Sequence, residues 1–171
     1  ADRKCGTDMV QRIKTDEGNM FQLGFIEFDD QGQLWDRDKQ KQHVVETIAK
    51  LGETQDLIMV VFVHGWKHSA APNDGNIDTF RSVLSDLTDA EVAMSNLKGV
   101  EPRKVFGVYL GWRGESVSIP VLDNLTFWDR KNTAHKVGYG GVTEVLSELE
   151  SIRDRQPDKH RDGSRTKLAV I

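Results

Sequence analysis

Apolar residues recur along this chain with two different spacings, one typical of strands and one typical of helices. The clearest strand is predicted over about 56–64. It contains a short run that is apolar at every position, Leu57-Ile58-Met59-Val60-Val61-Phe62-Val63, and this run ends abruptly at His64-Gly65. A run that is apolar on both faces favours a central parallel strand covered on each side. Alternation predicts another strand over 20–28, and shorter apolar runs predict strands over 103–112 and 166–171.

Helical spacing of apolar residues alternates with these strands. It predicts helices over about 37–51, 77–96, 125–137 and 142–155. The apolar positions expected to face the core in the second helix are Phe80, Val83, Leu84, Leu87 and Val92. Strands that alternate with helices predict an α/β fold with a mostly parallel sheet and helices on both faces. Residues 1–19 have weak periodicity and are expected to form an irregular lead-in.

Composition narrows the class of protein. With 171 residues, 37% hydrophobic and 29% charged, the chain is long enough for one globular domain. A formal net charge of −4 argues against a nucleic-acid surface, and no apolar run approaches the roughly 20 residues that span a bilayer. The single Cys5 excludes an internal disulfide and a thiolate metal cluster. A cytoplasmic location is slightly favoured, although a start at Ala1 without Met is equally compatible with a removed leader.

Candidate chemistry follows the strands directly. Ligands in α/β folds bind at the carboxyl ends of strands, where Lys67 and His68 follow one strand and Trp112 and Arg113 follow another. These four residues are candidate substrate contacts, with solvated loop positions as the alternative.

A zinc site is a further candidate. Imidazole and carboxylate groups of His64, His68, Asp74 and Asp78 are suitable zinc ligands. However, a His-X-X-X-His pair shares one face only on a helix, and Gly65 argues against a helix here. We therefore expect no metal and no cofactor.

The segment Val61-Phe62-Val63-His64-Gly65-Trp66 resembles the strand-His-Gly-X motif of the α/β-hydrolases. The order of predicted elements resembles that family from about Phe21 to Ile171. The residues His64-Gly65-Trp66-Lys67-His68 and the polar loop after them resemble bacterial members of it in particular. The resemblance implies that the backbone N–H of Trp66 lies in an oxyanion hole, with His64 and Gly65 as structural support. It also implies a small acyl or lipid ester substrate. The alternative for Trp66 is a loop tryptophan that closes the core.

One departure from the family decides what the chain is expected to do. The nucleophile elbow Gly-X-Ser-X-Gly occurs nowhere in the sequence, and Gly114-Glu115-Ser116 lacks the second glycine and follows the wrong strand. We therefore expect residues 20–171 to be the N-terminal portion of an α/β-hydrolase domain with an incomplete core. Such a chain is predicted to be inactive alone, because nucleophile, acid and catalytic histidine would lie beyond Ile171. The alternative is a non-catalytic α/β binding or assembly module.

The resemblance also places the last strand, 166–171, inside the sheet, flanked by strands that come later. Ending at Ile171 would then expose the backbone edge of that strand. Self-association through this edge is the expected consequence.

Overall fold

The computed structural model describes residues 9–28, 33–34, 39–64, 75–112, 140–155 and 166–171. The strands are β1 (Val10–Lys14), β2 (Met20–Phe28), β3 (Leu57–Val63), β4 (Lys104–Trp112) and β5 (Lys167–Val170). The helices within these residues are α1 (Lys39–Gly52), α2 (Gly75–Lys98) and α4 (Gly141–Arg155). The predicted α/β fold is confirmed, and the expected helix over 125–137 lies outside the described residues.

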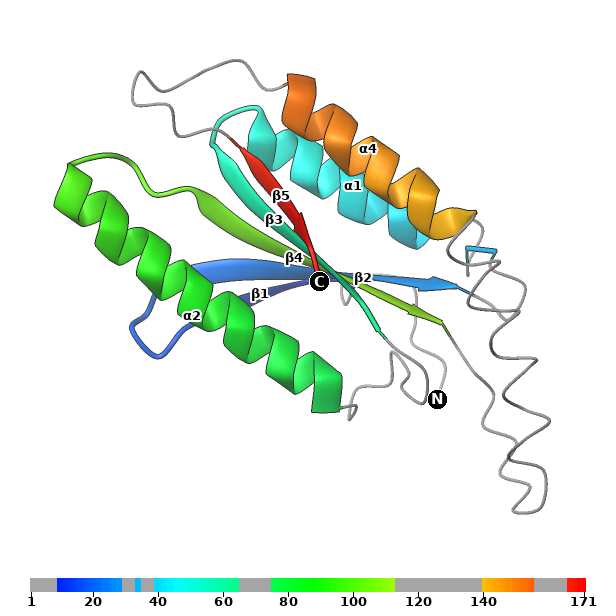
Figure 1. Ribbon diagram of the computed structural model, residues 1–171, viewed down its shortest axis with the longest axis horizontal. Helices are drawn as coiled ribbons and strands as arrows, with labels where there is room; N and C mark the ends of the chain where they lie inside the picture. Colours follow the sequence, from blue (N-terminus) through cyan, green and yellow to red (C-terminus); the bar gives the residue numbers. More distant parts are fainter. Residues whose placement is uncertain (1–8, 29–32, 35–38, 65–74, 113–139, 156–165) are drawn as a thin grey trace.

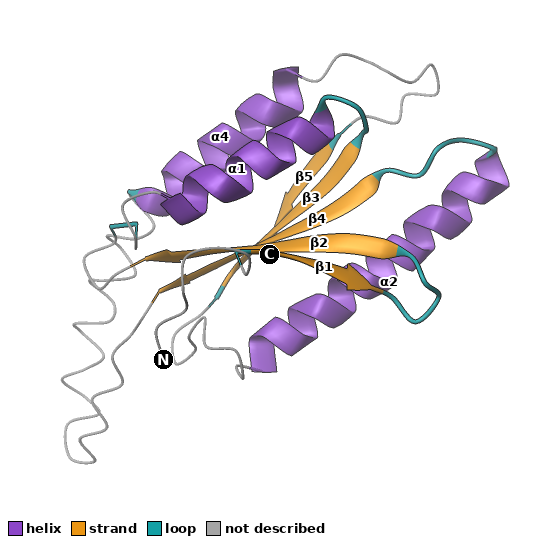
Figure 2. Ribbon diagram, turned by 180° about the vertical axis from the view of Figure 1, so that it is seen from behind, coloured by secondary structure: helices purple, strands orange, loops and turns teal. Residues whose placement is uncertain are grey.

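The five strands form one sheet in the order β1-β2-β4-β3-β5 (Figure 1). Four of them are parallel, and β1 alone runs antiparallel to its neighbour β2. Helices cover both faces: α1 and α4 lie side by side on one, and α2 lies on the other (Figure 2). Because β3 and β4 have neighbours on both sides, their near-continuous apolar runs are buried on both faces, as a central parallel strand requires.

Alternate residues of the central strands fill two separate cores. In β3, Leu57, Met59 and Val61 pack in the core under α1 and α4. Ile58 and Val60 point the other way, into the core under α2. The period-2 alternation of a strand therefore divides one apolar run between two helical layers.

Two glycines let the helices approach the sheet closely, one on each face. A Cβ atom built on Gly24 of β2 would lie 2.9 Å from both Cγ atoms of Val44 on α1. A Cβ atom on Gly107 of β4 would lie 2.3 Å from Cδ1 of Leu84 on α2. Both distances are shorter than real Cβ contacts, so each helix rests where the strand has no side chain.

The expectation of an irregular lead-in over residues 1–19 is wrong for residues 10–14, which form β1. The strand is held as one arm of a hairpin, whose turn contains Gly18 at φ 85°. Asp89 of α2 accepts hydrogen bonds from Thr15 Oγ1 and Asn19 Nδ2, each at 2.7 Å. Tertiary contacts of this kind, rather than an alternating apolar pattern, place the strand, which is why the sequence pattern missed it.

Ion pairs complete each helical layer. The Lys41 ammonium of α1 contacts the carboxylates of Glu144 and Glu148 on α4. On the other face, Arg103 donates to both carboxylate oxygens of Glu91 on α2, at 2.8 and 2.7 Å. The first ion pair joins two helices, and the second joins α2 to the segment that enters β4.

The long helix α2 differs from prediction at two of the five positions expected to face the core. Phe80 and Leu84 are buried as expected, and Leu87 is partly buried against the core. Val83 is 42% exposed, and neither Val83 nor Val92 belongs to the core. Leu84 turns toward the sheet at Gly107, and Val83, the residue before it, therefore lies on the flank of the helix.

No helix in the described part of the chain has the length and apolarity needed to cross a membrane.

Candidate active site

The strand ends that the sequence marked out come together at one edge of the sheet. His64 directly follows β3, and its backbone N–H donates to the carbonyl oxygen of Leu110 in β4 at 3.2 Å. Trp112 is the last residue of β4 and pairs with Phe28 at the end of β2. The carboxyl ends of these three parallel strands thus form the edge at which α/β proteins bind ligands.

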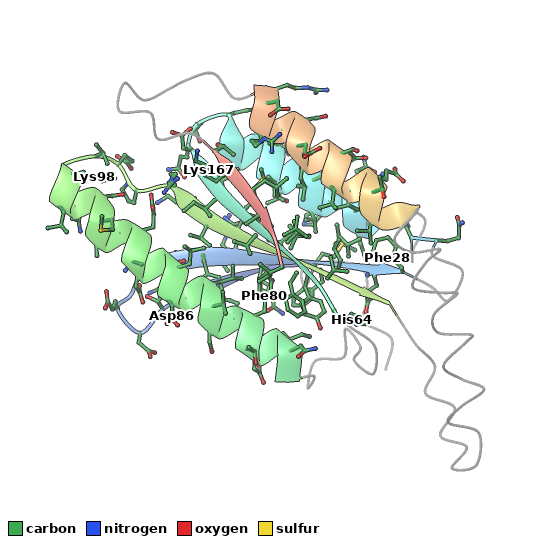
Figure 3. All side chains as sticks on the ribbon, in the orientation of Figure 1. Phe28, His64, Phe80, Asp86, Lys98 and Lys167 are labelled. Carbon is green, nitrogen blue, oxygen red and sulfur yellow. The ribbon has the colours of Figure 1, made fainter. Side chains whose placement is uncertain are left out.

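His64 is buried rather than presented to solvent. It is 1% exposed, and its ring stacks on that of Tyr109, with centroids 6.0 Å apart and planes at 26°. Its place at the end of β3 is labelled in Figure 3.

An aromatic cluster centred on Tyr109 lies beneath this junction. The Tyr109 ring stacks with Phe62 at 5.3 Å and contacts Phe25 at 5.9 Å and Phe80 at 6.3 Å. These rings come from β2, β3, β4 and the first turns of α2. Four elements therefore pack together through these rings directly below the strand ends.

A buried carboxylate lies in the same row of the sheet. Glu27 of β2 pairs with Gly111 of β4, and His64 comes opposite Gly111 on the other side, because Val63 pairs with Leu110. Glu27 is only 4% exposed. Gln40 of α1 accepts a hydrogen bond from the Glu27 backbone N–H at 2.9 Å and donates to its carboxylate at 3.1 Å.

Sequence reasoning missed Glu27 and Tyr109 as parts of this region. The signal for Glu27 was present, because alternation places it on the same side of β2 as Phe21, Leu23 and Phe25. A carboxylate on an otherwise apolar side of a strand indicates a buried acid that needs a partner. Gln40, on a separate helix, gave no comparable signal.

The remaining predicted residues lie at or beyond the border of the described chain. Gly65, Trp66, Lys67, His68 and Arg113 lie outside the described residues, and for Trp112 only the backbone is described. For the zinc candidates, His64 and Asp78 are described and the other two are not. Within the described ranges, no group of three or more His, Cys, Asp or Glu side chains is placed to hold a metal ion.

Comparisons with known proteins do not identify a relative. No protein family matches the chain, and no curated protein or solved structure is significantly similar to it. The findings therefore establish an α/β domain with a five-stranded, mostly parallel sheet.

Proposed function

We propose that this chain is the N-terminal portion of a serine hydrolase that cleaves carboxylic or lipid esters by acyl transfer. The proposal rests on the motif His64-Gly65-Trp66 after a central strand. It assigns Trp66 to an oxyanion hole and places the nucleophilic serine, the acid and the catalytic histidine beyond Ile171. The chain 1–171 is accordingly inactive by itself.

One observation supports this arrangement more than any other: the end of β5 lies directly beside the end of β3. The Ile171 N–H donates to the Val61 carbonyl at 2.9 Å, and the Val63 N–H donates to the Ile171 carbonyl at 3.1 Å. In this register the second residue after Ile171 would lie opposite His64, about 4.8 Å away, which is one strand spacing. That is the neighbourhood an attacking serine and an N–H at residue 66 must share.

The chemistry needs two donors aimed at the same oxygen. The serine would attack the ester carbonyl carbon, and negative charge would develop on the carbonyl oxygen as the tetrahedral intermediate forms. The N–H of Trp66 and an N–H beside the serine would donate to that oxygen. The alcohol then leaves, and water hydrolyses the acyl-serine.

His64 has a supporting role in this proposal. Its ring is buried on Tyr109 and its N–H is bonded to β4, so it fixes where the chain leaves the sheet. A fixed exit point is what an oxyanion donor two residues later requires, because such donors act through preorganised geometry. Lys67, His68, Trp112 and Arg113 remain candidates for contacts to the acyl or alcohol part of the substrate.

Covalent labelling tests whether the longer protein has a nucleophilic serine. The natural gene is read past the codon for Ile171, its product is expressed, and both that product and the chain 1–171 are treated with a fluorophosphonate probe. We expect labelling of one serine in the longer product and none in residues 1–171. A gene that stops at Ile171, or continues without a reactive serine, would remove the catalytic proposal.

A proline substitution tests the Trp66 donor itself. In the labelled longer product, Trp66→Pro removes the backbone N–H, whereas Trp66→Phe keeps it and changes only the side chain. We expect kcat to fall about 100-fold or more for W66P, the usual effect of losing one oxyanion donor, with a small change for W66F. Equal losses in both variants, with folding intact by circular dichroism, would assign Trp66 to packing.

A second candidate function is a non-catalytic binding or assembly module. The observation that favours it is the lack of Gly-X-Ser-X-Gly anywhere in the 171 residues. The same labelling experiment separates the two candidates. An unreactive longer product would favour the module, with the His64-Gly65-Trp66 turn retained as architecture.

A further inference from the structure

The ring of Tyr109 is packed by three other rings as well as by His64. Phe62 lies directly opposite it on β3, with centroids 5.3 Å apart and planes at 17°. Phe25 of β2 contacts it at 5.9 Å, and Phe80 of α2 at 6.3 Å. Tyr109 is fully buried. Because these three neighbours belong to three different elements, the position of the Tyr109 ring is determined by the packing of the domain as a whole.

His64 reaches this ring diagonally, from the end of β3 to β4. Its own partner in the register of the two strands is Gly111, because Val63 pairs with Leu110. Gly111 has no side chain that could pack against the imidazole. The His64 ring stacks instead on Tyr109, two residues earlier in β4, with centroids 6.0 Å apart and planes at 26°. Diagonal neighbours on one face of a sheet are within reach of aromatic side chains.

The hydrogen bond that holds the His64 backbone to β4 is a long one. The His64 N–H donates to the Leu110 carbonyl at 3.2 Å, the upper end of the normal range. Hydrogen bonds at the ends of strands also open more readily than those in the middle. The stack on Tyr109 is therefore a second restraint on His64, and it acts on the side chain rather than on the backbone.

The position of His64 matters for the proposed hydrolase, because the donor assigned to the oxyanion hole is the N–H of Trp66, two residues later. Two residues span at most about 7 Å, so a shift at His64 is passed on to this donor. Oxyanion donors act through preorganised geometry, and a displacement of about 1 Å can cost about 100-fold in rate. A restraint on His64 is therefore also a restraint on the geometry of the donor.

We propose that Tyr109 is a positioning residue, which fixes the point where the chain leaves β3 toward Trp66 through its stack with His64. This inference rests on the proposed hydrolase function. It extends that function to β4, because a residue of the neighbouring strand then controls the geometry of the oxyanion donor. Tyr109 is buried beneath the strand ends and has no contact with the substrate in this proposal.

Three variants separate the stack on His64 from ordinary core packing. Tyr109→Leu removes the ring, whereas Tyr109→Phe keeps it. Phe25→Leu is the matched control, because it removes another ring of the same cluster on β2, two strands away from β3. Y109L and F25L should shift the urea midpoint by comparable amounts, since each replaces a buried ring by leucine. An effect of Y109L that F25L lacks then comes from the contact with His64.

Steady-state kinetics of the longer, serine-containing product give the first measurement. The substrate is a p-nitrophenyl ester of a short fatty acid. We expect kcat of Y109L to fall about tenfold while KM stays within about twofold of wild type, because the oxyanion donor acts in the transition state. Y109F and F25L should keep kcat within about twofold of wild type, because both retain the ring that His64 stacks on.

Amide hydrogen exchange of the chain 1–171, followed by NMR, gives a second measurement that needs no catalysis. The His64 amide should exchange about tenfold faster in Y109L than in wild type, because the strand end opens more readily without the stack. Its exchange should be nearly unchanged in Y109F and F25L. The amide of Val61, inside β3, is the internal reference and should respond equally to Y109L and F25L.

The two measurements distinguish failure of this inference from failure of the proposed function. A longer product without a reactive serine overturns the proposed function, and the role of Tyr109 in catalysis with it. A reactive serine together with equal losses of kcat in Y109L and F25L overturns this inference alone and assigns Tyr109 to the core. A loss in Y109F as large as in Y109L overturns it as well, because the ring is then not what matters. Unchanged exchange at His64 in Y109L contradicts the route through His64.

Discussion

The two faces of the sheet share one type of helix contact and differ in the rest of their packing. On each face a helix sits over a glycine of the sheet, Val44 of α1 over Gly24 and Leu84 of α2 over Gly107. The α1–α4 face then adds a second helix and a buried ammonium that ties the two together. The α2 face instead leaves an apolar flank exposed. Among the described residues, the two faces thus differ in the number of helices that cover them and in how much of each helix is buried.

The glycine contacts are expected to produce the largest effects, and they differ between the faces. Gly107→Ala places a Cβ 2.3 Å from Leu84 and 3.1 Å from Phe80, whereas Gly24→Ala places one 2.9 Å from Val44. We expect losses in the free energy of unfolding of about 3 kcal/mol for G107A and about 1.5 kcal/mol for G24A. Urea denaturation of both variants measures the difference.

A double-mutant cycle identifies the cause. Leu84→Ala removes the Cδ1 atom that the new methyl group meets, so the loss in the G107A/L84A double variant should be clearly smaller than the sum of the two single losses. Additive losses would show that Gly107 is needed for its backbone conformation rather than for the close approach of α2.

Lys41 is expected to give the next largest effect, on the α1–α4 face. Burial alone lowers the pKa of its ammonium, but hydrogen bonds to Glu144 and Glu148 outweigh burial and raise the pKa above 10.5. Lys41→Met leaves two carboxylates one helical turn apart without their shared cation. Because both glutamates keep contact with water, we expect a loss of about 2 kcal/mol, less than for a fully buried pair.

Lysine 39 provides the matched control for that measurement. Lys39→Met changes an exposed lysine two residues earlier in α1 and should alter stability by less than about 0.5 kcal/mol. The same loss in K39M and K41M would mean that charge near the start of α1, rather than the contact with α4, is what matters.

On the α2 face, Glu91 is expected to make stability depend on pH. The hydrogen bond from the Arg103 guanidinium lowers the pKa of Glu91 below its ordinary value of 4.5, and this outweighs burial, which raises the pKa. A depressed folded-state pKa means that the stabilisation is complete above pH 4.5 and is lost as pH falls through the lower folded value. Glu91→Gln should cost about 1.5 kcal/mol at neutral pH.

The shape of the pH dependence is the decisive observation. Thermal unfolding of wild type and E91Q is followed from pH 7 down to about pH 3, and we expect the gap between them to narrow below pH 4.5. Glu46→Gln, at an exposed position of α1, should show no such gap. A constant gap at all pH values would assign the E91Q loss to packing.

Whether the sequence predicts an element depends on whether a local pattern or a long-range contact determines that element. The apolar run of β3 and the helical spacing of α1 and α4 are local patterns, and they gave the fold class and most boundaries. β1 could not be predicted, because its place depends on the contact of Thr15 with Asp89, 74 residues away. Spacing alone predicts Val83 in the core, but spacing cannot show which residues of the helix turn toward the sheet.

The candidate site also has one part that a local pattern predicts and one part that depends on contacts between separate elements. The His64-Gly65 break after a buried strand predicted which edge of the sheet to consider, and the structure brings His64 and Trp112 to that edge. The stacking of His64 on Tyr109 and the bonding of Glu27 to Gln40 join separate elements. Such contacts follow from the strand order, which no local pattern contains.

The smallest expected effect tests the comparison of the two faces most directly. Leu97→Ala on the exposed flank of α2 should change the free energy of unfolding by less than about 0.5 kcal/mol, because the side chain is 82% exposed. Leu149→Ala in the buried core under α4 should cost about 3 kcal/mol for the same chemical change. Urea denaturation of the two variants measures this contrast. A loss near 2 kcal/mol for L97A would show that this flank of α2 is buried in solution, and the contrast between the two faces would then not hold.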